Sequence, residues 1–236
     1  MHTIRDLQTL AADLAHPYSW VQVLFFGGLG YLLCRDVPTT AAWAERLLAL
    51  CREQDFGLWM AAGQCLQGWA RAAQGQWEAG LAQIRQGLAD WRGTGAEVWS
   101  PFFLALLAEA SLQTGQVDAA LGAVTEALAG VRATGEHWWE AELVRLQGEG
   151  FQRQSVPDML QAEACFSQAL AIARQQEAKS LELRAAMSLS RLWQHQGKRA
   201  EAHALLAPVY DWFTERFDTA DLQEAQALLE ELGTAG

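Results

Sequence analysis

Histidine and carboxylate side chains are the residues whose types and spacing come nearest to a metal or catalytic site. His137 and Glu140 lie three residues apart, a spacing that places both on one face of a helix, where they could share a metal ion. They supply only two ligands, whereas a zinc site takes three or four from the protein. Glu136 and Glu140 also suit the first turn of a helix, where carboxylates stabilise the positive end of the helix dipole. The sequence therefore predicts no metal site.

A glycine cluster at 27–30 (GGLG) is the second candidate, because glycine-rich loops hold phosphate groups. A phosphate loop needs a strand before it and a helix after it, and this cluster lies inside an apolar helical run. It predicts a close contact between helices instead. No P-loop, nucleophile elbow, paired-histidine zinc motif or EF-hand loop occurs in the chain. No carboxylate pair has an apolar context that would tune it for acid–base chemistry. We expect a protein that is not an enzyme and needs no cofactor.

Charge and cysteine usage limit the partners further. The formal net charge is −11 and the basic residues form no cluster, so binding to nucleic acid or to an anionic membrane is not expected. Cys34, Cys51, Cys65 and Cys165 each lie in a helical apolar pattern without a C-x-x-C pair, which predicts reduced core thiols in a cytoplasmic protein. Residues 14–34 carry no formal charge, but their polar residues and glycines favour a buried helix over a membrane span.

Internal repeats organise the chain. Segment 75–81 (GQWEAGL) matches segment 115–121 (GQVDAAL), 40 residues later, and both run on to a Thr-Gly helix stop. A small residue, a large one four positions later and a small one three positions after that recur along the chain, because small residues let paired helices approach closely. The sets are Gly80/Ile84/Gly87, Ala120/Val124/Ala127, Ala162/Phe166/Ala169 and, more loosely, Ala202/Leu206/Val209.

The elements that must position any site are therefore helices. The sequence predicts an all-α fold, a right-handed α-solenoid of about five helix pairs with terminal capping helices, as one domain over residues 1–236. Alanine and leucine favour helix throughout. The expected elements are a first helix at 2–15, helix pairs at 18–54, 56–92, 96–133, 136–176 and 178–213, and a capping helix at 219–232.

The pairs resemble the tetratricopeptide repeat, a helix-turn-helix unit, in a form with long helices. That resemblance implies that the first helix of each pair lines a concave face that binds protein or peptide partners. Transferring the inward-facing positions of the repeat onto this sequence gives a set of candidate partner-binding residues. They are Trp69, Phe102, Glu109, Gln113, Glu142, Arg145, Glu149, Arg184, Arg191 and Gln194.

Two interpretations of these residues stay open at this point. In the first, Arg145, Arg184 and Arg191 bind carboxylates of a partner while Trp69 and Phe102 take an apolar segment. In the second, a tightly wound repeat buries the apolar residues and pairs arginine with glutamate internally. Most of the 11 tryptophans should fill gaps between helices. Adjacent tryptophans at 138 and 139 point in different directions, so one of the two is expected at the surface.

The C-terminal half carries a closer resemblance. Its segments 178–193 (AKSLELRAAMSLSRLW), 197–199 (GKR), 206–210 (LAPVY), 212–215 (WFTE) and 217–222 (FDTADL) are similar to the tetratricopeptide region of bacterial signalling ATPases fused to class III adenylate or guanylate cyclases. In that family a cyclase domain and an ATP-binding domain precede the repeats. Neither is present in this sequence, so no catalytic or nucleotide-binding residue is carried over, and the chain resembles an excised regulatory module or a stand-alone relative.

The sequence thus predicts a non-catalytic interaction or regulatory module, the C-terminal part of a larger signalling ATPase/cyclase or related to one. Its expected partner is a protein or peptide, with other domains of a larger signalling protein among the candidates, and a homo-oligomer is compatible with the pattern. The alternative is a domain that senses a small-molecule effector, resembling that of maltose-type transcription activators.

Overall fold

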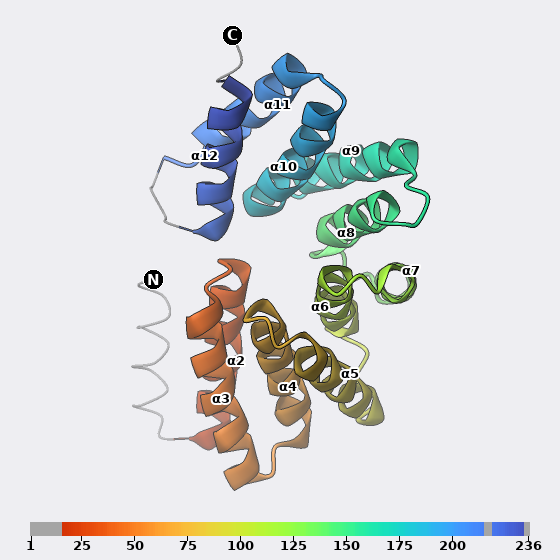
Figure 1. Cartoon of the computed structure of the whole chain (residues 1–236). Helices are drawn as coiled ribbons and strands as arrows, with labels where there is room; N and C mark the ends of the chain where they lie inside the picture. The colour runs from red at the N-terminus through yellow and green to blue at the C-terminus, as the bar shows by residue number, and fades with distance from the viewer. Residues whose placement is uncertain (1–15, 215–218, 234–236) are drawn as a thin grey trace. The chain divides into compact units, whose positions relative to one another are not determined.

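The computed structural model describes residues 16–214 and 219–233, which form eleven helices and no strand. The all-α fold predicted from composition and periodicity is confirmed over these ranges (Figure 1). The first helix expected at 2–15 lies outside the described residues. The helices are α2 (Pro17–Leu33), α3 (Val37–Gln54), α4 (Gly57–Ala73), α5 (Trp77–Gly93), α6 (Ser100–Gln113), α7 (Val117–Thr134), α8 (Glu140–Gln152), α9 (Met159–Gln175), α10 (Lys179–His195), α11 (Arg199–Asp211) and α12 (Ala220–Gly233).

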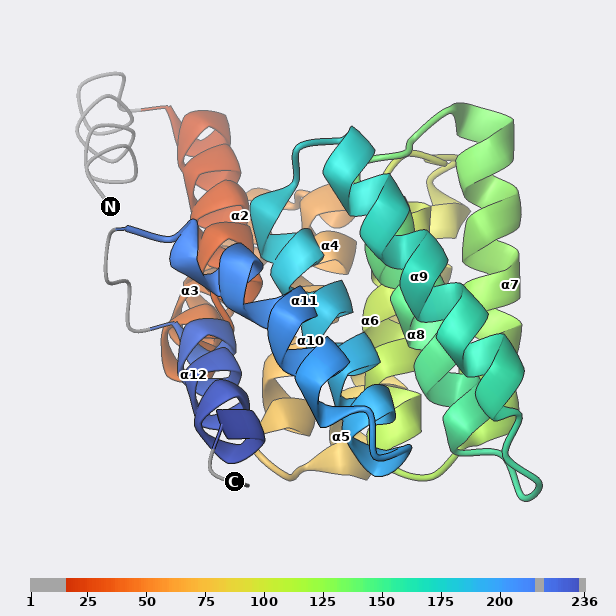
Figure 2. The same ribbon diagram turned by 90° about the horizontal axis from the view of Figure 1, so that it is seen from above.

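The chain divides into two compact units, Met1–Ala110 and Ser111–Gly236, with the division inside α6. In unit 1, α3 contacts both α2 and α4, and α4 contacts α5. In unit 2, the contacting neighbours include α8 with α9 and α10 with α11, as both views show (Figures 1 and 2). The contacts α2–α3, α4–α5, α8–α9 and α10–α11 coincide with helix pairs expected from the repeats, and α3–α4 joins two successive pairs. The single repeat domain expected over 1–236 stays a prediction.

Turns between paired helices follow from local sequence. Gly75 and Gly115, the matching residues of the two repeats, have φ of 86° and 73°, a left-handed conformation that glycine adopts without a steric penalty. The side chains of Asp36 and Asp158 accept hydrogen bonds from the backbone N–H groups of Thr39 and Gln161, at 3.1 and 3.0 Å. Each aspartate thereby caps the start of its helix, α3 or α9.

Small residues allow α4 and α5 to touch backbone to backbone. A Cβ atom added at Gly80 would lie 2.6 Å from the carbonyl oxygen of Gly68, and one added at Gly87 would lie 2.7 Å from that of Ala61. Between them, Ile84 is fully buried. The sequence pattern of small, large and small residues therefore has the packing role expected of it in this pair.

Helix α10 forms the centre of unit 2. It contacts α8, α9, α11 and α12, and all residues from 181 to 190 are buried, polar ones included. Leu183, Leu189 and Met187 pack with Phe166 of α9 and Leu206 of α11 in one apolar core. A helix covered on every side must also bury any charged residue it carries, so charged side chains on α10 need partners inside the protein.

Several details differ from the sequence-based expectations. Helix α6 begins at Ser100 rather than at Ala96, because Trp99 has a φ of 70° and a left-handed residue interrupts a right-handed helix. Helix α8 begins at Glu140 rather than at Glu136. Cys34 is exposed, and the prediction of a core thiol is wrong there, because this residue caps the end of α2 at a turn.

The other three cysteines, Cys51, Cys65 and Cys165, are buried as expected, and none of the four forms a disulfide. Burial raises the pKa of the Cys51 thiol to about 11 and also raises the pKa of Cys65 and Cys165. Among the described helices, none combines the length and apolar character needed to cross a membrane.

Candidate functional site

The candidate residues from the sequence all lie on first helices of pairs, and they are divided between the two units. Unit 1 holds Trp69 on α4 and Phe102 and Glu109 on α6. Unit 2 holds Gln113 at the end of α6, Glu142, Arg145 and Glu149 on α8, and Arg184, Arg191 and Gln194 on α10.

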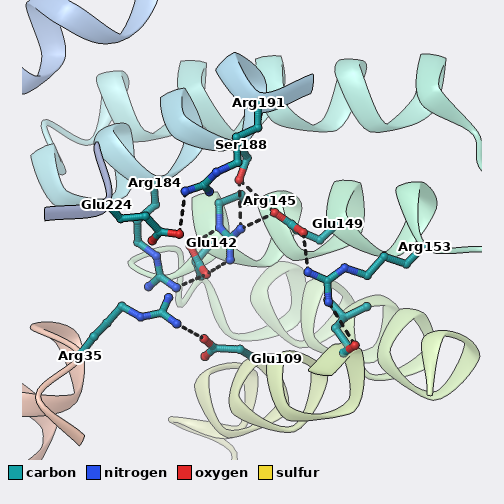
Figure 3. Close-up of polar contacts among 11 residues, drawn as sticks. Arg35, Glu109, Glu142, Arg145, Glu149, Arg153, Arg184, Ser188, Arg191 and Glu224 are labelled. Carbon is teal, nitrogen blue, oxygen red and sulfur yellow. Dashed lines mark hydrogen bonds and ion pairs between the residues drawn. The ribbon is translucent and has the colours of Figure 1, made fainter. Parts of the chain in front are cut away.

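In unit 1, the two apolar candidates belong to the interior. Phe102 is fully buried and Trp69 is 4% exposed. The indole N–H of Trp69 donates to Oε2 of Glu109 at 3.0 Å. Nη2 of Arg35 lies 3.2 Å from Oε1 of the same carboxylate (Figure 3). Glu109 therefore joins a buried indole to an arginine from the turn after α2. Arg35 was not among the candidates, because nothing in the local sequence connects it to a residue so far along the chain.

In unit 2, four charged candidates join Arg153 and Ser188 in what we call the arginine network: Glu142, Arg145, Glu149, Arg153, Arg184 and Ser188 (Figure 3). Nε and Nη2 of Arg145 donate to the two oxygens of Glu142 at 2.9 and 2.7 Å. Nη1 of Arg145 donates to Oε1 of Glu149 at 3.0 Å and to Oγ of Ser188 at 3.1 Å. Nη2 of Arg184 lies 2.9 Å from Oε1 of Glu142.

Burial makes the centre of this network a structural element. The exposed fractions are 2% for Glu142, 9% for Arg145 and 7% for Arg184. Removing one partner from such a buried ion pair costs about 3–5 kcal/mol, because the other charge stays buried without compensation. Internal pairing was the second of the two interpretations open from the sequence. A partner-binding role for these residues stays a prediction.

The candidates Arg191, Gln113 and Gln194 are more accessible, as is Arg153 at the end of α8. The Arg191 side chain is 38% exposed, and its Nη2 lies 2.6 Å from Oε1 of Glu224, which is 52% exposed and belongs to α12. The Arg153 side chain is 40% exposed and donates to Oε2 of Glu149 and to the carbonyl oxygen of Leu112, each at 3.1 Å. Gln113 is exposed, while Gln194 is half-buried and donates to Glu231 at 3.4 Å.

Arg153, Ser188 and Glu224 take part in these contacts but were not in the candidate set from the sequence. Arg184, Ser188 and Arg191 follow each other at spacings of four and three on α10, so they share one helix face. That spacing was a usable signal for Ser188. Glu224 carried no such signal, because its helix was interpreted as a cap with a solvated acidic face.

Two carboxylates of α9 and α10, Glu163 and Glu182, have shifted pKa values. Burial of Glu182 disfavours its ionised form, but hydrogen bonds from Lys179 and Arg174 outweigh that effect and lower the pKa of this carboxyl. The indole N–H of Trp193 donates to Glu163 at 2.8 Å and, helped by Gln196, lowers the pKa of that carboxyl as well. Both groups are therefore ionised partners that hold α10 to its neighbours. No group of three or more metal-ligating side chains occurs in the described ranges.

Tryptophan placement agrees in part with expectation. Trp139 is buried and Trp138 is half-buried, with its indole N–H donating to Glu136 at 2.9 Å. His137 and Glu140, the pair considered for a metal ion, instead lie 2.8 Å apart at the start of α8.

Paired helices that meet through small residues, joined by short turns and carrying their polar candidates on the first helix of each pair, define a tetratricopeptide-like repeat fold. Known structures agree with this class. The tetratricopeptide-like repeats of a putative kinesin light chain from Podosopora anserina match with a TM-score of 0.57 and 20% sequence identity, over 84% of this chain and 96% of that one. A Pseudomonas aeruginosa protein, pilF, matches with a TM-score of 0.57 and 13% identity, over 93% of this chain and 95% of its own. No model of a protein family and no curated protein matches the sequence.

Proposed function

We propose that the chain is a non-catalytic protein-interaction module that binds an acidic segment of a partner protein through Arg191 and Arg153. The repeat class supports an interaction role, since stacked helix pairs present extended surfaces to other proteins. The observation that carries the proposal is the contrast between the buried and the accessible arginines of unit 2. Arg145 and Arg184 are committed to internal carboxylates, whereas Arg191 and Arg153 keep more than a third of their side chains in solvent.

Arg191 has the greater capacity for a ligand. A guanidinium group has five N–H donors in a planar fork that fits a carboxylate. Within the described part of the chain, Glu224 is the sole ion-pair partner of Arg191. An incoming carboxylate can therefore bind the remaining donors or replace Glu224, whose own side chain is half exposed. Exchange of one solvated carboxylate for another requires no buried charge to move.

The test compares labelled acidic peptides with peptides in which every Asp and Glu is replaced by Asn or Gln, in fluorescence polarisation with the full chain. We expect the chain to bind the acidic peptides and not their amide counterparts. Raising the salt concentration should weaken this binding because exposed charges are screened. Arg191→Gln should weaken binding at least tenfold, since a hydrogen bond to a charged group contributes about 1.5–3 kcal/mol. Arg132→Gln, at an exposed arginine of α7, is the matched control. Equal binding of acidic and amide peptides, or equal effects of the two substitutions, would refute the proposal.

We further propose that the module works in the cytoplasm as a regulatory part of a larger signalling protein of the ATPase and cyclase type. The support is the resemblance of segments between 178 and 222. The reading frame on either side tests this: an in-frame ATP-binding domain upstream supports the proposal, and an upstream stop codon refutes it.

A further inference from the structure

Unit 1 carries a surface of aromatic rings on helix stretches that contain no charged residue; the charged residues of α4 and α6, Arg71 and Glu109, lie further along these helices. Residues 17–34, 57–70 and 100–108, which cover α2 and most of α4 and α6, contain no Asp, Glu, Lys or Arg. In a chain with a formal charge of −11, such a charge-free face is unusual. We call the rings of Tyr18, Phe25, Phe26, Trp59 and Trp99 the aromatic surface.

These rings form one continuous series of contacts. Tyr18 lies 6.1 Å from Trp59 between ring centroids, and Trp59 lies 5.3 Å from Phe25. Trp99 lies 5.3 Å from Phe25 and 6.0 Å from Phe26. The two outer members remain accessible, since Tyr18 is 41% exposed and Phe26 is 45% exposed. Both lie on one face of α2, eight residues apart.

The indole N–H of Trp59 has no hydrogen-bond acceptor in the described structure, although it is shielded from solvent. Other tryptophans of the chain have acceptors: Trp69 donates to Glu109, Trp91 to the carbonyl oxygen of Val98, and Trp193 to Glu163. A buried donor without an acceptor is destabilising and calls for an explanation. One such explanation is a ligand that supplies the hydrogen-bond acceptor for this N–H group.

Trp99 gives a second, independent indication. Its φ is 70°, a left-handed conformation that is strained for a bulky residue and must be held by its surroundings. The position immediately before α6 and the ring contacts with Phe25 and Phe26 place this side chain against α2. These ring contacts hold Trp99 in this conformation at the far end of the aromatic surface.

We propose that the aromatic surface binds a proline-rich segment of another protein in the extended polyproline II conformation. A charged segment is disfavoured, because its charges would lose water against rings that offer no counter-charge. A helical ligand can offer Trp59 a backbone carbonyl only at its C-terminal end, because all but its last four carbonyl groups are already hydrogen-bonded within the helix. An extended chain has unpaired carbonyls, but its N–H groups would need acceptors that aromatic rings lack. Proline has no N–H, and a polyproline II helix leaves every carbonyl available.

The geometry of docking follows from this complementarity. Pyrrolidine rings pack against the exposed faces of Tyr18 and Phe26, and one ligand carbonyl accepts the hydrogen bond from Nε1 of Trp59. Because this nitrogen is shielded in the unbound chain, a neighbouring ring must turn to admit the carbonyl. We assign this movement to Tyr18, since its ring lies 6.1 Å from that of Trp59 and it is 41% exposed. The site uses residues of unit 1 alone and does not depend on the arginines of unit 2.

The experiment measures binding of fluorescein-labelled decaproline to the full chain by fluorescence polarisation, with a Gly-Ser decapeptide as the ligand control. Saturable binding of decaproline alone is expected. Phe26→Ala should weaken it at least tenfold, and Trp59→Phe, which keeps a ring and removes the N–H group, should also weaken it at least tenfold. Trp212→Ala removes an aromatic side chain that is 55% exposed outside the aromatic surface and should leave binding unchanged.

Circular dichroism of each variant establishes that the fold is retained, and Phe26→Gln serves if Phe26→Ala fails to fold. Absence of saturable decaproline binding would overturn the proposal. So would equal binding of both peptides, or binding that Phe26 and Trp59 substitutions leave unchanged. Preferential binding of an amphipathic helical peptide or of lipid vesicles would also overturn it, since neither supplies a free carbonyl in a proline-rich chain.

Discussion

The contact between α4 and α5 gives the sharpest stability prediction, through the substitution Gly80→Ala. The added methyl group would lie 2.6 Å from the carbonyl oxygen of Gly68 and 2.7 Å from the backbone nitrogen of Ala72. The first distance is 0.8 Å short of the 3.4 Å at which ordinary contact begins. Both atoms belong to backbone, so no side chain can rotate away and the two helices must separate.

The magnitude follows from two opposing effects. Overpacking a tightly packed contact costs about 1–3 kcal/mol. Replacing glycine by alanine in a helix interior gains about 0.8–1 kcal/mol. A net destabilisation of up to about 2 kcal/mol is therefore expected for Gly80→Ala. Gly122→Ala in α7 makes the same chemical change at an interior helix position with no atom within 4 Å, so it should stabilise the protein by about 0.5–1 kcal/mol.

Urea unfolding followed by circular dichroism at 222 nm measures both variants. Gly93→Ala at the open end of α5 is the control within the same helix. A midpoint for Gly80→Ala at or above that of the unsubstituted chain would refute the claim that close backbone approach fixes this helix pair.

Three further predictions concern unit 2 and the thiols. Arg145→Met should destabilise unit 2 by about 3 kcal/mol in urea unfolding, because Glu142 keeps Arg184 but loses its bidentate partner. A smaller loss of stability than that caused by Arg191→Gln, at an exposed arginine, would contradict a structural role for Arg145. Because folding lowers the pKa of Glu182, the ionised carboxylate contributes fully to stability at pH values above the pKa that Glu182 has in the unfolded chain. That contribution is lost as the pH falls through the pKa of Glu182 in the folded chain. Glu182→Gln should accordingly reduce the loss of stability on acidification, and an unchanged acid-unfolding profile would argue against the ion pairs with Lys179 and Arg174. Ellman's reagent should modify exposed Cys34 in the folded chain and reach the three buried thiols only on unfolding; equal rates for all four would contradict the burial.

Helix content and pairing could be predicted from the sequence because both are local properties. The match of 75–81 with 115–121 located two turns, and the small residues at 80 and 87 indicated which helix faces would meet. Helix α6 begins four residues later than the sequence predicts, and this start could not be predicted. It depends on the left-handed backbone conformation of Trp99, which is favoured by the contacts of its ring with residues of α2.

Whether each charged candidate is buried or exposed depends on information that a repeat pattern does not contain. Arg184 and Arg191 have the same residue type and lie seven positions apart on one face of α10, yet one is buried and the other is 38% exposed. The difference arises from which neighbouring helices cover each turn of α10. Periodicity selects the face of a helix, while the depth of each residue on that face is a property of the tertiary packing.

The complete burial of residues 181–190 has a consequence for how this protein tolerates sequence change. A helix with a solvated side accepts substitutions there at little energetic expense, whereas every position in this stretch of α10 touches a neighbour and is constrained by it. Mutational libraries should therefore retain few variants in residues 181–190 and many on the outer face of α9. For a chain that no family model matches, this stretch is the segment from which distant relatives are best aligned.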